Sequence, residues 1–105
     1  MTKPPKLTEE QVRAALADLP EWNLEDGKLH RKLQFPDFNA ALGFMVAVGS
    51  HAEAHNHHPE WHNVYNRVEV WLTTHDAGGL TEKDLALARE IDRRTQGEST
   101  QAGSR

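Results

Sequence analysis

The sequence contains no cysteine among its 105 residues. Disulfide bonds, thiolate zinc sites and cysteine nucleophiles are therefore excluded. The chain also lacks an excess of basic residues: 12 Lys and Arg stand against 16 Asp and Glu, and the formal net charge is −4. General affinity for nucleic acid needs clustered cations that contact phosphates. We therefore expect no nucleic-acid partner.

Long apolar runs are missing as well. No segment approaches the ~18 consecutive apolar residues of a membrane span, and the first ten residues, MTKPPKLTEE, hold no apolar core of a signal peptide. We therefore expect a soluble, cytoplasmic protein without a membrane partner. A chain this short suits one domain with a small core, to which a partner surface would add buried area.

The two ends of the chain are poor in residues that could build a core. Residues 1–6 contain two prolines and two lysines, and residues 96–105, QGESTQAGSR, are polar throughout. We expect a disordered arm over 1–6 and a disordered tail over 96–105. A single folded domain is expected over 7–95.

The first half of this domain predicts a helix followed by a β-hairpin. The segment from Thr8 to Pro20 opens with the capping box T-E-E-Q and continues with apolar residues at helical spacing. Asp26-Gly27 then lies between two short runs in which apolar and polar residues alternate. This pattern is typical of two strands joined by a tight turn.

A second helix is predicted after Pro36, with Asp37 as its N-cap. It carries two adjacent apolar stripes at helical spacing. We expect the first stripe to pack on the sheet and the second to be exposed and used in self-association. The first stripe holds Phe38, Ala41, Leu42, Met45, Val46, Gly49 and Ala52, and the second holds Phe44, Val48, His51 and His55.

The last part of the domain changes period. Val68, Val70 and Leu72 alternate with polar or larger residues, which indicates a strand with one buried face. T-E-K-D at Thr81 then caps a final helix. The order of elements predicts an α+β fold of two layers, an antiparallel sheet with helices on one face.

Five of the seven histidines lie between His51 and His62. Imidazole is the commonest metal ligand, and His51 and His55 stand four residues apart, a spacing that suits one zinc ion. The run H-A-E-A-H is not the H-E-x-x-H of a catalytic zincin, and no cysteine can complete the ligand set. A metal-binding protein built on His51 and His55 is therefore an alternative, in which a third ligand would have to come from elsewhere in the chain.

An acid–base site is the other interpretation of the cluster. His57 and His58 end the second helix just before Pro59, which forces the preceding residue into extended geometry. His75 ends the strand VEVWLTTH. Glu53 lies at the edge of an apolar stripe, where a carboxylate needs a partner, and a nearby histidine could supply it.

The spacing of these residues resembles the signature of the pterin-4a-carbinolamine dehydratase family. Three contexts agree with it as well, FPDFNAALGFM, HHPEWHNVYNRV and LTTHDAGGLTEKD, and the likeness runs roughly from residue 7 to residue 91. Asn56, where an acid is common, and His62, which replaces an aromatic residue, fit less well. The signature residues are Glu53, His57, His58, Pro59, Tyr65, His75 and Asp84.

The resemblance implies a fold and an assembly. The fold is a four-stranded antiparallel sheet with three helices on one side, in agreement with the pattern of elements. The central helix is implied to take part in a homo-oligomer interface, which we assign to the second stripe, Phe44, Val48, His51 and His55.

The resemblance also implies an activity. A hydro-lyase of this family removes water from a 4a-hydroxytetrahydropterin to give the quinonoid dihydropterin, which recycles a tetrahydrobiopterin-type cofactor of aromatic amino-acid hydroxylases. The chemistry needs one general acid and one general base, and neither a metal nor a redox cofactor.

By this resemblance His57 and His75 form the acid–base pair, His58 holds the pterin ring, and Glu53 orients a histidine. Asp84 belongs to the signature but is also placed to cap the last helix, and both roles stay open. The remaining expected substrate contacts are Pro59, Thr74, Asp76 and Ala77 along the pocket and Trp22 at its rim.

The alternative from another functional class is a non-enzymatic interaction module. Some members of this family act as dimerisation partners of transcription factors through their helical face. Such a role here would rest on the second stripe and not on His57, His58 and His75.

Overall fold

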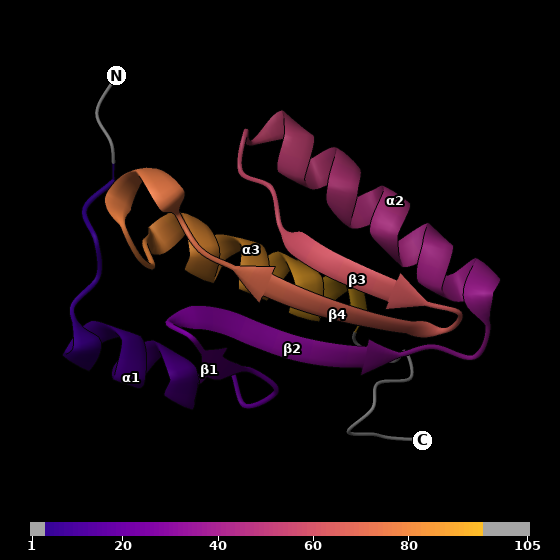
Figure 1. Ribbon diagram of the computed structural model, residues 1–105, viewed down its shortest axis with the longest axis horizontal. Coiled ribbons are helices and arrows are strands. Elements are labelled where there is room, and N and C mark those ends of the chain that lie inside the picture. Colours follow the sequence, from indigo (N-terminus) through magenta and orange to yellow (C-terminus); the bar gives the residue numbers. More distant parts are fainter. Residues whose placement is uncertain (1–3, 96–105) are drawn as a thin grey trace.

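The structure is a computed structural model that describes residues 4–95 (Figure 1). The expected tail 96–105 and the first three residues of the expected arm lie outside the described residues. The elements in chain order are α1 (Glu9–Ala17), β1 (Asn23–Glu25), β2 (Lys28–Gln34), α2 (Phe38–Ala54), β3 (Glu60–Val64), β4 (Arg67–Leu72), the short 3-10 helix η1 (His75–Ala77) and α3 (Glu82–Thr95).

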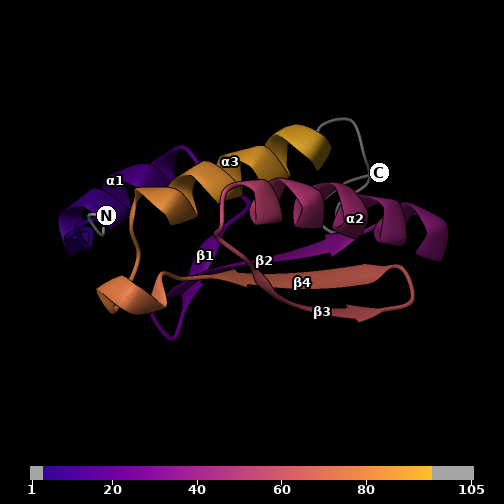
Figure 2. The same cartoon turned by 90° about the horizontal axis from the view of Figure 1, so that it is seen from above.

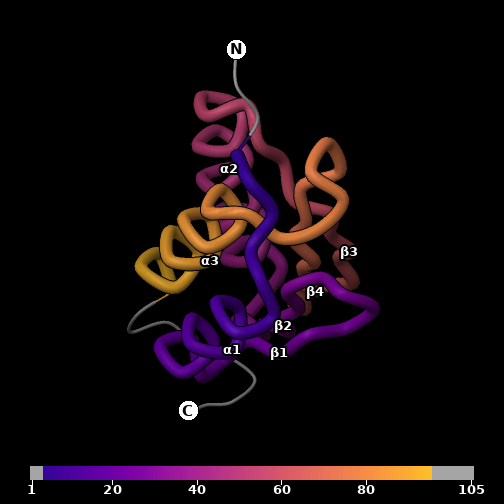
Figure 3. Tube along the Cα trace, turned by 90° about the vertical axis from the view of Figure 1, so that its left-hand side faces the viewer, coloured from indigo at the N-terminus to yellow at the C-terminus, as the bar shows by residue number. Residues whose placement is uncertain are grey.

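The strands form one sheet in the order β1-β2-β4-β3, and every neighbouring pair is antiparallel. Figures 2 and 3 show that α1, α2 and α3 cover one face of this sheet and leave the other face open. The expected α+β fold of two layers, with four antiparallel strands and three helices on one face, is confirmed.

Local signals in the sequence produce the expected ends and turns. Thr8 accepts a hydrogen bond from the Gln11 backbone at 3.1 Å, and the Gln11 side chain accepts one from the Thr8 backbone at 2.8 Å, which completes the capping box. Asp37 caps α2 through the Ala40 amide at 2.8 Å. Asp26 and Gly27 both have positive φ, 54° and 79°, as a two-residue hairpin turn of this kind requires.

The core lies between the sheet and the helices. Val68, Val70 and Leu72 of β4 point inward and are fully buried, as the alternation predicts. Leu29 and Leu33 of β2 lie beside them on the same face. The helices close the core from above with apolar residues of α1, α2 and α3.

The expected burial of the two stripes of α2 is confirmed for Ala41 and Ala52 of the first stripe but is wrong for the large apolar residues of both. Phe44 and Val48 are only 7% and 0% exposed and belong to the core, whereas Val46 is 60% exposed. Phe38 and Leu42 are exposed as well. Helical periodicity identifies stripes, but the rotation of the helix about its axis is set by the short connection from β2 and by packing against β4 and α3. The exposed face of α2, Phe38, Leu42 and Val46, is defined here as the outer face.

None of the helices within the described residues is both long and apolar enough to cross a bilayer.

Candidate active site

The end of α2 directs two histidines away from the helix. Asn56 has φ of 53°, a left-handed conformation that asparagine tolerates better than most residues. Its amide bonds to the Glu53 carbonyl at 3.2 Å, and the His57 amide bonds to the Ala52 carbonyl at 3.0 Å. These two bonds form a Schellman motif, so the departure at Asn56 from the family pattern has a local structural role.

His57 is held by a buried carboxylate. Its Nε2 lies 2.6 Å from Asp84 Oδ1, where Asp84 is fully buried and the His57 side chain is 12% exposed. Because a carboxylate oxygen accepts hydrogen bonds, Nε2 carries the hydrogen. The neutral ring therefore has its lone pair on Nδ1.

Asp84 makes contacts that fit both of the roles left open for it, through different oxygens. Oδ2 accepts from the Thr81 amide at 2.9 Å and from the Thr74 hydroxyl at 2.7 Å, which ties the start of α3 to the end of β4. Oδ1 is left for His57. One carboxylate can therefore cap α3 and hold the His57 ring at the same time, because it has enough lone pairs for both.

His58 forms a similar pair with Glu53. Its Nε2 lies 2.8 Å from Glu53 Oε1, so the expectation that Glu53 contacts a histidine is met. Glu53 was expected to need this partner because it would be partly buried at the edge of an apolar stripe. That expectation is wrong, since the Glu53 side chain is 81% exposed. The contact follows instead from the chain reversal at Asn56, which brings His58 back beside the last turn of α2.

His75 forms a third pair, with a residue that the sequence analysis missed. Its Nε2 lies 3.1 Å from Glu60 Oε2, and Lys28 Nζ donates to Glu60 Oε1 at 2.7 Å. The hydrogen bond from Lys28 lowers the pKa of Glu60 below its ordinary value. No pattern in the sequence connects Glu60 with His75, because the sheet register and η1 bring them together.

The three histidines line one pocket of about 280 Å³. The expected contacts Thr74 and Asp76 line it too, whereas Pro59 and Ala77 only adjoin lining residues in the chain. Lys83 lines the pocket and was not anticipated. The full lining is Asn56, His57, His58, Thr73, Thr74, His75, Asp76 and Lys83.

Trp22 does not lie at the rim of this pocket, contrary to expectation. It is 5% exposed, and its indole nitrogen donates to Asp92 at 2.8 Å. Asp92 lies eight residues beyond Asp84 on α3, a rise of about 12 Å along a helix. Asp92 also pairs with the buried Arg31, so Trp22 belongs to the core beneath β2.

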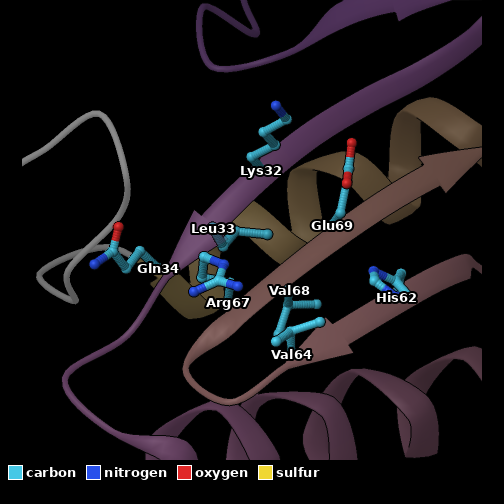
Figure 4. A pocket seen from close by; sticks show the side chains of 8 residues that line it. All are labelled: Lys32, Leu33, Gln34, His62, Val64, Arg67, Val68 and Glu69. Atoms are coloured by element: carbon cyan, nitrogen blue, oxygen red, sulfur yellow. The ribbon is translucent and has the colours of Figure 1, made fainter.

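A second hollow, of about 330 Å³, lies on the sheet over β2, β4 and β3 (Figure 4). Lys32, Arg67, His62 and Glu69 supply its charged or titratable groups. None of the three carboxylate–histidine pairs of the first pocket contributes to it. It is larger, but it brings together none of the expected site residues.

The candidate metal ligands His51 and His55 do not form a site with a third ligand within residues 4–95. Their rings stack with centroids 4.1 Å apart, and His55 Nδ1 lies 2.9 Å from the His51 carbonyl. The described group whose ligand atoms converge within 4.8 Å is a different one, Glu25, His30 and Glu69. His30 there already bonds to Glu69 at 2.6 Å and to Asn23 at 2.9 Å.

The three histidines of the pocket are held in the same way. In His57, His58 and His75, a carboxylate binds Nε2, and no hydrogen bond to Nδ1 of these rings is found within the described chain. A ring with a free Nδ1 and a fixed Nε2–H can accept a proton and, once charged, return it. The fold and this site define an α+β protein with a pocket lined by three histidines, each held by a carboxylate.

Comparisons with known proteins agree with this class. The family model "Pterin 4 alpha carbinolamine dehydratase" matches residues 5–94. Relatives with the provisional name pterin-4-alpha-carbinolamine dehydratase are 53% identical over 87 residues in Solibacter usitatus and 55% identical over 89 residues in Burkholderia orbicola. These alignments cover 83% of this chain in both cases, and 92% and 87% of the relatives.

A solved structure is similar as well. The crystal structure of a "transcriptional coactivator/pterin dehydratase" from Brucella melitensis aligns with a TM-score of 0.81 and 43% identity. The alignment covers 84% of this chain and 96% of the Brucella chain. The chain therefore belongs to the pterin 4 alpha carbinolamine dehydratase family.

Proposed function

We propose that this protein is a hydro-lyase that dehydrates a 4a-hydroxytetrahydropterin to the quinonoid dihydropterin. The observation that carries the proposal is the pocket in which His57, His58 and His75 are each held at Nε2 by a carboxylate. Membership of the family supplies the substrate class. The reaction would recycle a tetrahydrobiopterin-type cofactor after an aromatic amino-acid hydroxylase has acted.

The reaction requires two proton transfers. A base removes the proton from ring N5, the bond between C4a and its hydroxyl oxygen breaks, a C4a–N5 double bond forms, and an acid protonates the departing oxygen to give water. His57 suits the base, because the buried Asp84 carboxylate stabilises the imidazolium that forms. His75, which is 77% exposed, suits the acid, since it can exchange protons with solvent between turnovers.

The other site residues bind and orient. His58, fixed by Glu53, is proposed to hold the pterin ring. Thr74 and Asp76, with the neighbouring Pro59 and Ala77, are proposed to border the substrate beside His75. Positioned acid and base groups typically accelerate a reaction by about 10²–10⁴-fold each. We expect His57 and His75 each to contribute an acceleration in this range.

The direct test is turnover of a 4a-hydroxytetrahydropterin followed by ultraviolet absorbance, with the uncatalysed dehydration subtracted. An accelerated appearance of the quinonoid dihydropterin supports the proposal. A rate equal to the background, with folded protein verified by circular dichroism, would refute it.

Activity is expected to be independent of metal. Acid and base are both imidazoles, and each Nε2 is already occupied by a carboxylate. Dialysis against a strong chelator should leave the rate equal to that of protein dialysed against buffer alone. A variant carrying both His51→Ala and His55→Ala should behave in the same way. Loss of activity on dialysis and its restoration by zinc would contradict the acid–base mechanism.

We further propose that the protein self-associates through α2, at the outer face rather than at Phe44 and Val48. Phe38, Leu42 and Val46 are 44%, 42% and 60% exposed and stand four residues apart along the helix. Such a stripe on an exposed helix fits a partner helix of the same kind. His51 and His55 lie near the far end of α2, beside Glu90 of α3 in the case of His51.

The same outer face carries the second candidate function, an interaction module that pairs with a transcription factor. The observation in its favour is this exposed apolar stripe, and the similar Brucella protein is named a transcriptional coactivator as well as a pterin dehydratase. The two functions use different residues, so substitutions at the outer face should spare dehydration and substitutions of the histidines should spare association.

Leu42→Asp is expected to dissociate the oligomer while the subunit stays folded, because a carboxylate enclosed at an apolar interface would be unpaired. Light scattering measures the mass. Leu24→Asp is the matched control, since Leu24 is 47% exposed but lies on β1, away from α2. If the unmodified protein is a monomer, or if Leu24→Asp dissociates it equally, the outer face is not the interface.

A further inference from the structure

Glu60 is a carboxylate outside the family signature, and it bonds to a histidine that lines the pocket. It is the first residue of β3, directly after Pro59, and pairs in register with Trp71 of β4. This places Glu60 at the same end of the sheet as η1, which begins at His75. Its Oε2 lies 3.1 Å from His75 Nε2.

The other oxygen of Glu60 is anchored from a different element. Lys28, the first residue of β2 after the hairpin turn, donates to Oε1 at 2.7 Å. Because this hydrogen bond holds one oxygen of the carboxylate in place, it also fixes the direction of the other oxygen. The same ammonium lowers the pKa of Glu60, with a smaller contribution from His75, so the carboxylate stays ionised throughout the range in which a histidine titrates.

His75 needs such an anchor more than the other two histidines do. Its side chain is 77% exposed, and it follows a strand end instead of lying between packed elements. The only hydrogen bond of its ring within the described residues is the one to Glu60. Without Glu60 the ring is free to rotate about its side-chain bonds, and either nitrogen could hold the proton.

We propose that Glu60, anchored by Lys28, is a positioning residue that holds His75 with Nε2–H toward the carboxylate and Nδ1 toward the pterin. In the imidazolium form Nδ1 carries the proton that passes to the departing hydroxyl oxygen, and after the transfer the ring is the neutral Nε2–H tautomer. The proposal rests on the proposed function, because it concerns the geometry of the proposed acid. It makes Asp84–His57, Glu53–His58 and Glu60–His75 three pairs of one kind around one pocket.

Glu60→Ala is expected to lower kcat by about 10-fold, in line with residues that orient a reacting group, while KM changes less than twofold. Glu60→Gln should recover part of the loss, because its amide oxygen can still accept from Nε2–H. Lys28→Met should lower kcat by a smaller factor than Glu60→Ala. Glu69→Ala is the matched control, since it breaks the His30–Glu69 contact of 2.6 Å, whose histidine does not line the pocket, and should leave kcat unchanged.

A double-mutant cycle shows whether Glu60 acts through His75. In a His75→Ala background, Glu60→Ala should lower kcat by less than twofold, because the ring to be positioned is gone. An undiminished 10-fold loss in that background would overturn the proposal. So would a wild-type kcat for Glu60→Ala.

Nitrogen NMR of the imidazole rings provides a readout independent of turnover. In the unmodified protein the neutral His75 ring should be the Nε2–H tautomer, and in Glu60→Ala it should become a mixture of both tautomers. An unchanged tautomer in Glu60→Ala would refute the positioning role. Failure of the unmodified protein to accelerate dehydration would refute the proposed function and leave this NMR result as the separate test of the pair.

Discussion

His57→Ala is expected to lower kcat by about 10²-fold or more, the largest catalytic loss among the histidine variants, because it removes the proposed base. The ring stands between a fully buried carboxylate and the pocket, with Nε2 held at 2.6 Å from Asp84. In the proposed mechanism neither of the other two pocket histidines takes over this step, because His58 holds the pterin ring and His75 supplies the acid. Steady-state kinetics, corrected for the uncatalysed reaction, measures the effect.

His55→Ala is the matched control for this variant. His55 is the exposed C-cap of α2, two residues earlier in the chain, and bonds only to its own helix among the described contacts. Its replacement should change kcat and KM by less than about twofold. Circular dichroism should show both variants folded.

An equal loss of activity in His55→Ala and His57→Ala would place the reaction on the other side of the His57 ring. His57 also borders a smaller hollow of about 150 Å³ lined by His51, His55, Lys83, Ala86 and Leu87. If His55→Ala were as damaging as His57→Ala, the reaction would take place on that side of His57. His75 and Glu60 would then have no part in it.

Val48→Asp is expected to unfold the subunit, whereas Val46→Asp is expected to leave it folded. Val48 lies on the buried side of α2 and is fully buried, so the variant would place an unpaired carboxylate in the core at a cost of about 3–5 kcal/mol. A domain of this size has a total stability of roughly 5–15 kcal/mol, so little or none would remain. Val46, at 60% exposure, leaves its substitute in solvent.

Thermal unfolding followed by circular dichroism compares the two variants. Val48→Asp should show no cooperative transition or a strongly lowered Tm, and Val46→Asp should stay within a few degrees of the unmodified protein. Because both variants carry the same substitution on the same helix, they differ only in the direction in which α2 turns the substituted residue. Equal stability of the two variants would mean that α2 does not turn Val48 toward the sheet.

Much of the fold could be predicted because its signals are local. The capping box at Thr8, the Asp37 cap and the Asp26-Gly27 turn involve residues within three positions of one another, and each forms as expected. The alternation of Val68, Val70 and Leu72 likewise predicted which face of β4 is buried. The order of elements then left an antiparallel sheet with helices on one face as the natural arrangement.

The prediction failed where orientation depends on distant parts of the chain. Both stripes of α2 are apolar, and only its contacts with β4 and α3 decide that Phe44 and Val48 face inward. Trp22 was expected at the pocket rim from the family resemblance, but its indole nitrogen donates to Asp92, 70 residues away. Periodicity contains no information about either choice.

For the candidate site, the sequence by itself determined that histidines flank a helix end and a strand end, with Glu53 and Asp84 at family spacing. Only the tertiary structure decided how each ring is held. Asp84 reaches His57 across 27 positions, and Glu60 reaches His75 while Lys28 grips it from 32 positions away. Such partners come together through strand register and helix packing, whose free energies depend on many residues at once, so no short segment could encode them.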